Sequence, residues 1–446
     1  MKDRLNKRLF QPTDALPLEI FRYFFILTLI LQFYSFYAFK FLQGGILAPV
    51  YLFTFQGLSF LSEIPEGGMK FLYALLLIAP ILMLIKKVFR IAVLIYLVAF
   101  SSFFLVEQSY YNNHFYLIIL YCFFWLFYNP QKHEGKLSVP GWLLFLFQIQ
   151  LFIVYFYGGL VKLNFDWLVN QEPMATLLRI NSAQLPSANL ATSSFIIYYL
   201  TYGGLVFDLL IGFLLLNRKT LWFGIILNTT FHLTNIFLFN IGEGGDIGIF
   251  PIMMILTNVI FIPAHILRNW ALKLGIGAKA VFPPGKGKPV EELKISAPKV
   301  KPWLVAYLVI QLLLPFRYHL IGSDVDWTGQ ASFFAWRMKS YTKQCEIKFF
   351  YQPNAAQPKQ EYKMGRIINT MQIDRMAQHT NMIYQFIQFI KIDLKRKEGL
   401  VNPIITAEVK IGFNGRSPQY FIDPMQNLTH VEFSSFSRPN WVLPLK

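Results

Sequence analysis

The feature that most constrains the fold is a recurring series of apolar runs, each about as long as a membrane-spanning helix. A hydrocarbon core of about 30 Å needs roughly 20 apolar residues, because each helical residue rises about 1.5 Å. The chain of 446 residues is 55% hydrophobic and 15% charged, whereas soluble domains carry about 25% charged residues. We therefore predict nine spans: residues 19–40, 69–86, 90–107, 112–129, 142–162, 194–216, 221–239, 246–266 and 302–316.

The connections between these spans differ in charge. One side collects nineteen Lys and Arg residues, from the N-terminus, "KKVFR", "QKHEGK", "NRKT" and residues 267–301, whereas the opposite connections hold only Arg179. Because cytoplasmic loops are enriched in Lys and Arg, we expect a multi-pass protein of the cell inner membrane with a cytoplasmic N-terminus and a periplasmic C-terminal domain. The net charge of +17 then reflects orientation, and nothing indicates nucleic acid as a partner.

The composition changes after about residue 317. In residues 345–351 and 407–413, apolar and polar side chains alternate, as they do in half-buried strands. Residues 367–395 carry apolar side chains at helical spacing, which predicts an amphipathic helix. We predict a polytopic α-helical membrane protein of about nine transmembrane helices, followed by an extracytoplasmic α+β domain with a β-sandwich-like sheet. The expected divisions are a cytoplasmic segment 1–18, a transmembrane catalytic domain 19–316 that includes a cytoplasmic linker 267–301, and an outer domain 317–446.

Standard metal and nucleotide chemistry is not indicated. The two cysteines, Cys122 and Cys345, support neither a disulfide framework nor a zinc site, and we expect both to be free thiols. No two of the seven histidines have the spacing of a zinc or di-iron site, and no phosphate-binding or nucleophile-elbow motif occurs. We therefore predict no metal.

One lysine lies where a predicted span ends. Lys162, in "GGLVKLNFDW", follows two glycines that allow a helix or a flat ligand to approach the backbone closely. One interpretation is a lysine whose ammonium reaches the headgroups. The other is a lysine held in a dry pocket, where burial favours the neutral amine and makes it available as a base.

Other polar residues fall inside the predicted spans, where ionisable groups are costly and are functional candidates by default. Asn113 and His114 belong to "YYNNHFYL", and His232 belongs to the polar stretch "NTTFHLTN". Helix capping and helix–helix hydrogen bonding are the structural alternatives for these two groups. Asp208 must be paired or protonated, so a structural partnership with a Tyr or Lys competes with a catalytic role.

Eight blocks of the sequence resemble the vitamin K-dependent γ-glutamyl carboxylase family, in the same order from about residue 20 to the end. The blocks are "YNNHFYL", "FIVYFYGGLVKLNFDW", "YGGLVFDLLIGFLL", "FHLTNIFLFNIG", "QLLLPFRY", "DWTGQASFFAWRMK", "YFIDP" and "NWVLPL". The membrane region of that family is also known as the horizontally transferred transmembrane domain. The resemblance implies an enzyme whose lysine base deprotonates vitamin K hydroquinone, which dioxygen converts to the 2,3-epoxide, with coupled carbon dioxide addition to a peptide glutamate.

Residue by residue, the resemblance places the base at Lys162 and a quinone-polarising histidine at His114, next to Asn113. It matches His232, Arg179 and Asp208 to further residues of the quinone site. The co-substrate implied is an isoprenoid naphthoquinol (phylloquinol or menaquinol), with O2 and CO2. The partners implied are membrane lipid and a Glu-containing peptide or protein. Aromatic residues near the lysine, among them Tyr157 and Trp167, suit a flat naphthoquinone, although ordinary lipid-facing aromatics are the alternative.

Departures from the family leave two other functions open. The animal enzymes have an additional lysine where this chain has Val161, they are much longer, and "EGGDIG" (243–248) resembles an insertion. A quinol epoxidase that does not carboxylate is one alternative. A non-catalytic membrane module that binds quinone or lipid is the other, although such a module has no need of a buried base.

Overall fold

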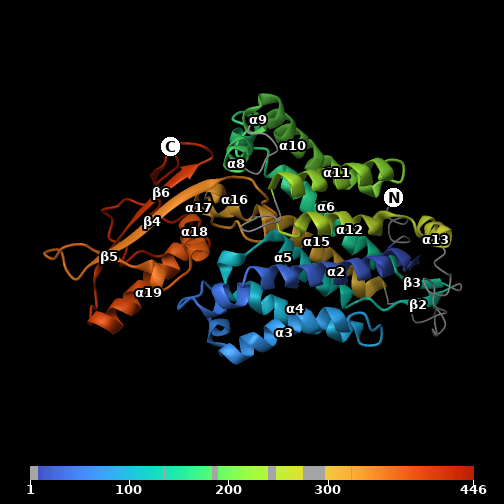
Figure 1. The fold of residues 1–446 in the computed structure, drawn as a ribbon, viewed down its shortest axis with the longest axis horizontal. Coiled ribbons are helices and arrows are strands. Elements are labelled where there is room, and N and C mark those ends of the chain that lie inside the picture. The colour runs from blue at the N-terminus through green and yellow to red at the C-terminus, as the bar shows by residue number, and fades with distance from the viewer. Residues whose placement is uncertain (1–8, 134–135, 183–188, 240–247, 275–296, 323) are drawn as a thin grey trace.

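Each predicted apolar run contains a helix in the computed structural model, which describes residues 9–133, 136–182, 189–239, 248–274, 297–322 and 324–446. Helices satisfy their backbone hydrogen bonds internally, as a lipid environment requires. The main helices are α2 (Leu16–Ala38), α3 (Glu66–Leu82), α4 (Phe89–Val106), α5 (Asn113–Trp125), α6 (Gly141–Leu160), α10 (Ser194–Leu216), α11 (Leu221–Phe239), α12 (Phe250–Thr257) and α15 (Ala297–Leu313). They lie side by side in a bundle (Figure 1).

Short helices connect the long ones. These are η1 (Phe41–Leu47), η2 (Ser59–Glu63), η3 (Gln108–Tyr110), α7 (Phe165–Leu168), α8 (Met174–Ile180), α9 (Asn189–Thr192), η5 (Asn258–Phe261), α13 (Ala264–Lys273), η7 (Leu314–Phe316), α16 (Tyr318–Ile321) and α17 (Val325–Thr328). The stretch α7–α9 follows Lys162 and lies at the end of the bundle that faces the C-terminal domain (Figure 1). Residues 243–247 of the predicted "EGGDIG" insertion and most of the 267–301 linker fall outside the described residues.

Fewer helices meet the length of a full span than the sequence predicts. Within the described ranges, five helices are long and apolar enough to cross a membrane: α2, α4, α6, α10 and α11. The α12–η5 segment and α13 make a sixth only if they form one span, because they meet at a bend of 103°. Helix α5 has 13 residues, about 20 Å, and is therefore shorter than the hydrocarbon core. The chain is a membrane protein, and the count of about nine stays a prediction.

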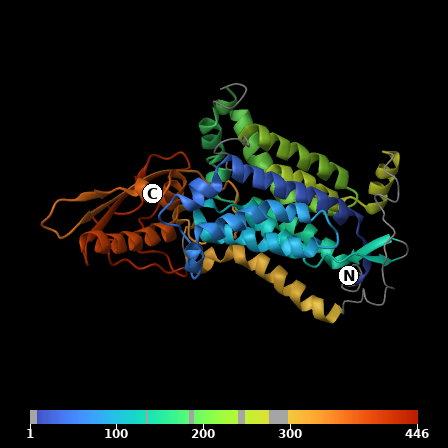
Figure 2. The ribbon, with the colours of Figure 1, turned by 60° about the horizontal axis from the view of Figure 1, so that its bottom comes forward.

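A small sheet closes the end of the bundle remote from the C-terminal domain (Figures 1 and 2). Strand β3 (Lys136–Pro140) pairs antiparallel with β1 (Pro12–Asp14) and with β2 (Gln131–His133). Arg268 of α13 forms an ion pair with Asp14 at the same end. The N-terminal strand and two of the basic connections thus share one end of the bundle, in agreement with the charge asymmetry of the sequence.

The C-terminal domain contains one antiparallel sheet of order β5-β4-β6-β7. Its strands are β4 (Lys343–Gln352), β5 (Gln360–Tyr362), β6 (Ile404–Phe413) and β7 (Gln419–Tyr420). Alternate residues of β4, such as Ile347 and Phe349, share an apolar core with Phe386 of α19 (Thr380–Glu398). The α+β prediction is confirmed, but in the described residues helices cover this sheet, so it is not the predicted β-sandwich.

Helix α18 (Thr370–Gln378) fastens this domain to the bundle. Asn369 caps the helix, and the Gln372 side chain completes the capping box. The same Gln372 amide donates to Tyr51 O (2.9 Å) and to Glu107 Oε2 (2.7 Å). Burial raises the pKa of Glu107, and hydrogen bonds from Ser109, Phe53 and Gln372 oppose that rise. These buried bonds hold α18 over the outer end of the bundle.

Candidate active site

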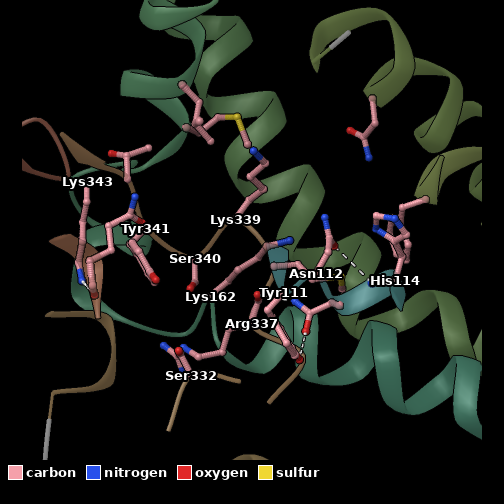
Figure 3. Close-up of a pocket in the computed structure, with 18 of the residues that line it drawn as sticks. Tyr111, Asn112, His114, Lys162, Ser332, Arg337, Lys339, Ser340, Tyr341 and Lys343 are labelled. Atoms are coloured by element: carbon pink, nitrogen blue, oxygen red, sulfur yellow. Dashed lines mark hydrogen bonds between the residues drawn. The ribbon is translucent and has the colours of Figure 1, made fainter. Parts of the chain in front are cut away.

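A cavity of about 680 Å³ lies between the outer end of the bundle and the C-terminal domain. The bundle contributes the N-terminal end of α5, the α6–α7 segment, α10, α11 and the start of α12, and the C-terminal domain contributes residues 332–343 and α18. Figure 3 shows Lys162 between His114 on one side and Tyr341 and Lys343 on the other. The volume falls within the range of about 300–1,000 Å³ that is usual for small-molecule sites.

Lys162 is buried and paired in this cavity. Its ammonium donates a hydrogen bond to Asp208 of α10, and the two side chains are 8% and 6% exposed. The ammonium also lies 5.0 Å from the centre of the Trp167 ring. A lysine so enclosed does not extend to headgroups, so the alternative of a headgroup anchor does not describe its position here.

The glycine pair before Lys162 makes this contact possible. A Cβ at Gly159 would lie 2.9 Å from the backbone nitrogen of Leu209, and one at Gly158 would lie 3.3 Å from Asp208 Oδ2. Any larger residue would therefore push α10 away from α6. The close approach of the two helices brings Asp208 within reach of Lys162.

His114 occupies the first turn of α5, where the Asn112 side chain accepts a hydrogen bond from its backbone nitrogen. His114 Nε2 lies 3.2 Å from Gln32 Oε1, which can only accept, so the proton is on Nε2. His114 Nδ1 is a buried acceptor with no hydrogen-bond partner among the described residues. The neighbouring Asn113 donates to Arg337 O (2.8 Å) and thereby ties α5 to the C-terminal domain.

His232 is oriented by a chain of buried polar groups. The Tyr155 hydroxyl donates to Asn228 Oδ1 (2.6 Å), so it accepts from His232 Nε2 (2.7 Å). Asn228 in turn donates to Asn258 Oδ1 (2.6 Å). His232 Nδ1 is therefore also an acceptor, and it too has no partner within the described ranges. The predicted helix–helix hydrogen bonding exists, and it fixes the tautomer of a histidine that lines the cavity.

Two predicted site residues lie outside the cavity lining. The Tyr157 hydroxyl donates to Leu312 O of α15, and the Tyr157 ring packs on Phe316, so this side chain joins helices. Arg179 of α8 is 59% exposed and donates to Glu172 Oε1 (3.2 Å) and Thr176 Oγ1 (3.0 Å). The other six, Lys162, His114, Asn113, His232, Asp208 and Trp167, line one cavity.

The cavity also has a basic outer wall, which the residues predicted from the sequence do not include. Lys339, Lys343 and Arg375 of the C-terminal domain line the cavity, and Arg337 does so while paired with Asp326 (2.5 Å). Lys343 donates to two backbone carbonyls, those of Trp327 (2.7 Å) and Gln378 (2.9 Å), and burial lowers its pKa to about 8. Three of these basic residues lie in the run "WRMKSYTK". Their close spacing is the one sequence pattern that could have indicated a basic wall.

Comparison with protein families accounts for almost the whole chain. Residues 10–266 match the HTTM domain, and residues 297–446 match the lumenal domain of vitamin K-dependent gamma-carboxylase. The chain belongs to the vitamin K-dependent gamma-carboxylase family. The second match includes α15, so the carboxylase lumenal unit begins with the last apolar helix. A comparison with solved structures finds no match.

The cavity suits the naphthoquinol that this family uses. Two buried acceptors, His114 Nδ1 and His232 Nδ1, are available for the hydroxyl groups of a quinol. Aromatic rings of Tyr155, Trp167 and Phe231 lie in the same lining and complement a flat ring system. No group of three or more potential metal ligands occurs within the described residues.

Proposed function

We propose that this protein oxidises a vitamin K-type naphthoquinol to its 2,3-epoxide at the Lys162 cavity and couples this reaction to γ-carboxylation of a peptide glutamate. The observation that carries the proposal is the buried Lys162–Asp208 pair, which shares one cavity with two histidine nitrogens that have no hydrogen-bond partner in the part of the chain that the structure describes. A module that only binds quinone has no need of a buried ion pair beside the ring. The bound quinol supplies the reduced ring that dioxygen oxidises.

The Lys162–Asp208 pair offers a route to a neutral amine. The ion pair and the neutral pair hold the same number of protons and differ only in which group carries one. Exclusion of water by a bound quinol penalises the two charges, so the proton moves from Lys162 Nζ to Asp208 Oδ2. The amine then accepts a proton from a quinol hydroxyl, as a general base within hydrogen-bond reach does.

The histidines act as acceptors that orient the quinol. The hydrogen bond from His114 to Gln32 and that from His232 to Tyr155 keep both Nδ1 atoms unprotonated. One of these Nδ1 atoms accepts a hydrogen bond from one ring hydroxyl, and this orients the quinol so that its other hydroxyl can donate its proton to Lys162. Apolar walls around this site, including Phe231 and Phe250, keep the reacting groups from water.

The basic outer wall suits an acidic peptide. Lys339, Lys343 and Arg375 lie on the side of the cavity formed by the C-terminal domain. A carboxylate that enters from this side meets favourable charge before it reaches Lys162. We assign this wall to the glutamate-containing substrate that the family implies. We also propose an inner-membrane location with the N-terminus in the cytoplasm and the lumenal-type domain in the periplasm.

The direct test measures the epoxide formed from reduced vitamin K and dioxygen by purified protein. We expect K162A to abolish the product, and K363A, which removes an exposed lysine of the outer domain, to resemble the wild type. Because K162A leaves Asp208 buried without its partner, K162M/D208N is tested beside it to separate loss of chemistry from loss of fold. Wild-type epoxide yield in either Lys162 variant would remove the lysine from the mechanism.

A second assay distinguishes carboxylation from epoxidation alone. The protein receives labelled carbon dioxide, reduced vitamin K and Glu-containing peptides, and acid-labile incorporation into the peptide is measured. Incorporation that depends on Lys162 supports the coupled reaction. Epoxide formation without incorporation into any peptide would identify an epoxidase.

A further inference from the structure

The turn between β6 and β7 contacts the segment that carries Lys162. Asp166 of α7 accepts hydrogen bonds from Arg416 through both carboxylate oxygens, from Nη2 to Oδ1 (2.6 Å) and from Nη1 to Oδ2 (2.8 Å). Asn414 also donates to Asp166 Oδ2 (2.8 Å). These residues lie about 250 positions apart in the sequence, so the contact joins the lumenal-type domain to the bundle.

The backbone of the same turn lies against α8. A Cβ at Gly415 would lie 2.9 Å from Glu172 Oε1, 2.9 Å from Thr176 Oγ1 and 3.2 Å from Arg179 Nη2. Gly415 also has a φ of +74°, which L side chains rarely adopt. Only glycine lets the turn approach this closely, and α8 lies beside the adjacent end of the sheet in Figure 1. The turn is therefore seated on two neighbouring elements, α7 and α8.

A short connection leads from Asp166 to the Lys162 ammonium. The next residue, Trp167, donates its indole N–H to Thr201 O (2.9 Å), and its ring faces Lys162 Nζ at 5.0 Å. On the other side, Asn164 caps α7 and also donates to Val161 O (2.9 Å). A displacement of α7 would therefore move both the ring beside the lysine and the backbone next to it.

The contact is charged throughout the neutral pH range. Burial alone would raise the pKa of Asp166, but hydrogen bonds from Arg416, Asn414 and Asn170 outweigh it and lower that pKa. The hydrogen bond to Asp166 raises the pKa of Arg416, and burial opposes this. The Asp166 side chain is 13% exposed, so its two hydrogen bonds from the Arg416 guanidinium are partly shielded from salt. Bidentate Arg–carboxylate pairs fix geometry as well as charge.

We propose that Arg416 is a positioning residue: by holding Asp166, the β6–β7 turn of the lumenal-type domain sets the position of Trp167 and Lys162 in the reaction cavity. The role in turnover rests on the proposed function, whereas the effect on Lys162 itself does not. Through this contact, the docked C-terminal domain holds Lys162, a residue of the membrane domain, in the position that proton abstraction requires.

The experiment compares R416Q with R438Q, which removes an exposed arginine from the same domain. We expect R416Q to lower kcat for epoxide formation about ten- to a hundred-fold with the quinol KM unchanged, because displacement of a catalytic group by about 1 Å costs up to about 10²-fold. R416K keeps the positive charge but cannot form both hydrogen bonds to the Asp166 carboxylate, so its kcat should lie between those of R416Q and the wild type. R438Q should match the wild type.

Acylation of Lys162 by acetic anhydride, followed by mass spectrometry, gives a readout that does not require turnover. We expect faster labelling of Lys162 in R416Q than in the wild type and R438Q, at an unchanged thermal unfolding midpoint. Unchanged kcat and labelling in R416Q would overturn the proposal. A uniform loss of kcat, quinol affinity and thermal stability would overturn it too, since it would indicate a structural role only. If wild-type protein forms no epoxide, the proposed function fails, and the labelling ratio alone decides the positioning role.

Discussion

Replacing Asp208 by Asn tests whether Lys162 needs a partner that can take its proton. The substitution keeps the shape of the side chain but removes its negative charge. Since both side chains are less than one-tenth exposed, water cannot replace the lost partner. We expect lower stability and slower epoxide formation.

The size of the effect follows from the burial of the pair. Two unit charges 4 Å apart interact by about 4 kcal/mol at an effective dielectric constant of about 20. Removing one member of a buried pair costs about 3–5 kcal/mol, because the other charge stays without compensation. We take about 3 kcal/mol. In D208N the Lys162 ammonium has no partner that can take its proton, and a cost of the same size for forming the neutral amine corresponds to roughly a hundred-fold lower rate, at about 1.4 kcal/mol per factor of ten.

The assay needs two measurements on each variant. The free energy of unfolding is measured by reversible denaturation in mixed detergent micelles, and epoxide formation is measured under saturating quinol. D423N, an isosteric change at an exposed aspartate of the outer domain, is the matched control. In K162M/D208N, where both charges are absent, we expect the free energy of unfolding to return toward the wild-type value while epoxide formation stays absent.

Two results would refute the proposed pairing of Lys162 with Asp208. If D208N forms epoxide within about three-fold of the wild-type rate, Asp208 neither stores the proton nor stabilises the ammonium. If K162M/D208N is less stable than D208N, the two residues do not act as a pair.

Further predictions concern the outer wall and the histidine chain. Because the pKa of Lys343 is about 8, its ammonium is lost as the pH rises through 8, so the KM for an acidic peptide should increase between about pH 7 and 9, and K343M should flatten this profile. The free energy of unfolding should rise over about pH 8–10.5, since the unfolded state then binds the extra proton, and K343M should remove that rise as well. Tyr155→Phe removes the acceptor for His232 Nε2 and should slow epoxide formation by up to about ten-fold, as expected for one hydrogen bond. A Y155F rate equal to that of the wild type would show that the tautomer of His232 does not matter.

The candidate site residues that the sequence indicated are polar groups in apolar surroundings. Lys162, His114, His232 and Asp208 stand out because charge and hydrogen-bonding capacity are costly in lipid. Tyr155 and Tyr157 have the same side chain in the same apolar run, but they face different surroundings. They are two positions apart on α6, so their side chains point about 200° apart, and only Tyr155 faces the cavity. Composition alone could not distinguish them.

The residues of the basic outer wall could not be predicted from polarity in this way. Basic residues are ordinary in an extramembrane domain, and Lys339 and Lys343 become part of the site only when that domain docks on the bundle. The helix predicted over 367–395 is likewise two helices, α18 and α19, which separate at His379. The extended backbone of His379 and its packing against Gly329 and Phe333 depend on tertiary contacts that periodicity does not report.

The cavity wall is divided between two units of the chain, and this division has an evolutionary consequence. A mutation in residues 332–343 can widen or narrow the cavity or change its charge without altering any helix of the bundle. Under the proposed function, selection for a new peptide substrate can therefore act on the C-terminal domain while the residues of the bundle that face the quinol stay constant. The two parts also depend on each other. A C-terminal domain exchanged between relatives must keep Arg416, because this residue binds Asp166 of α7.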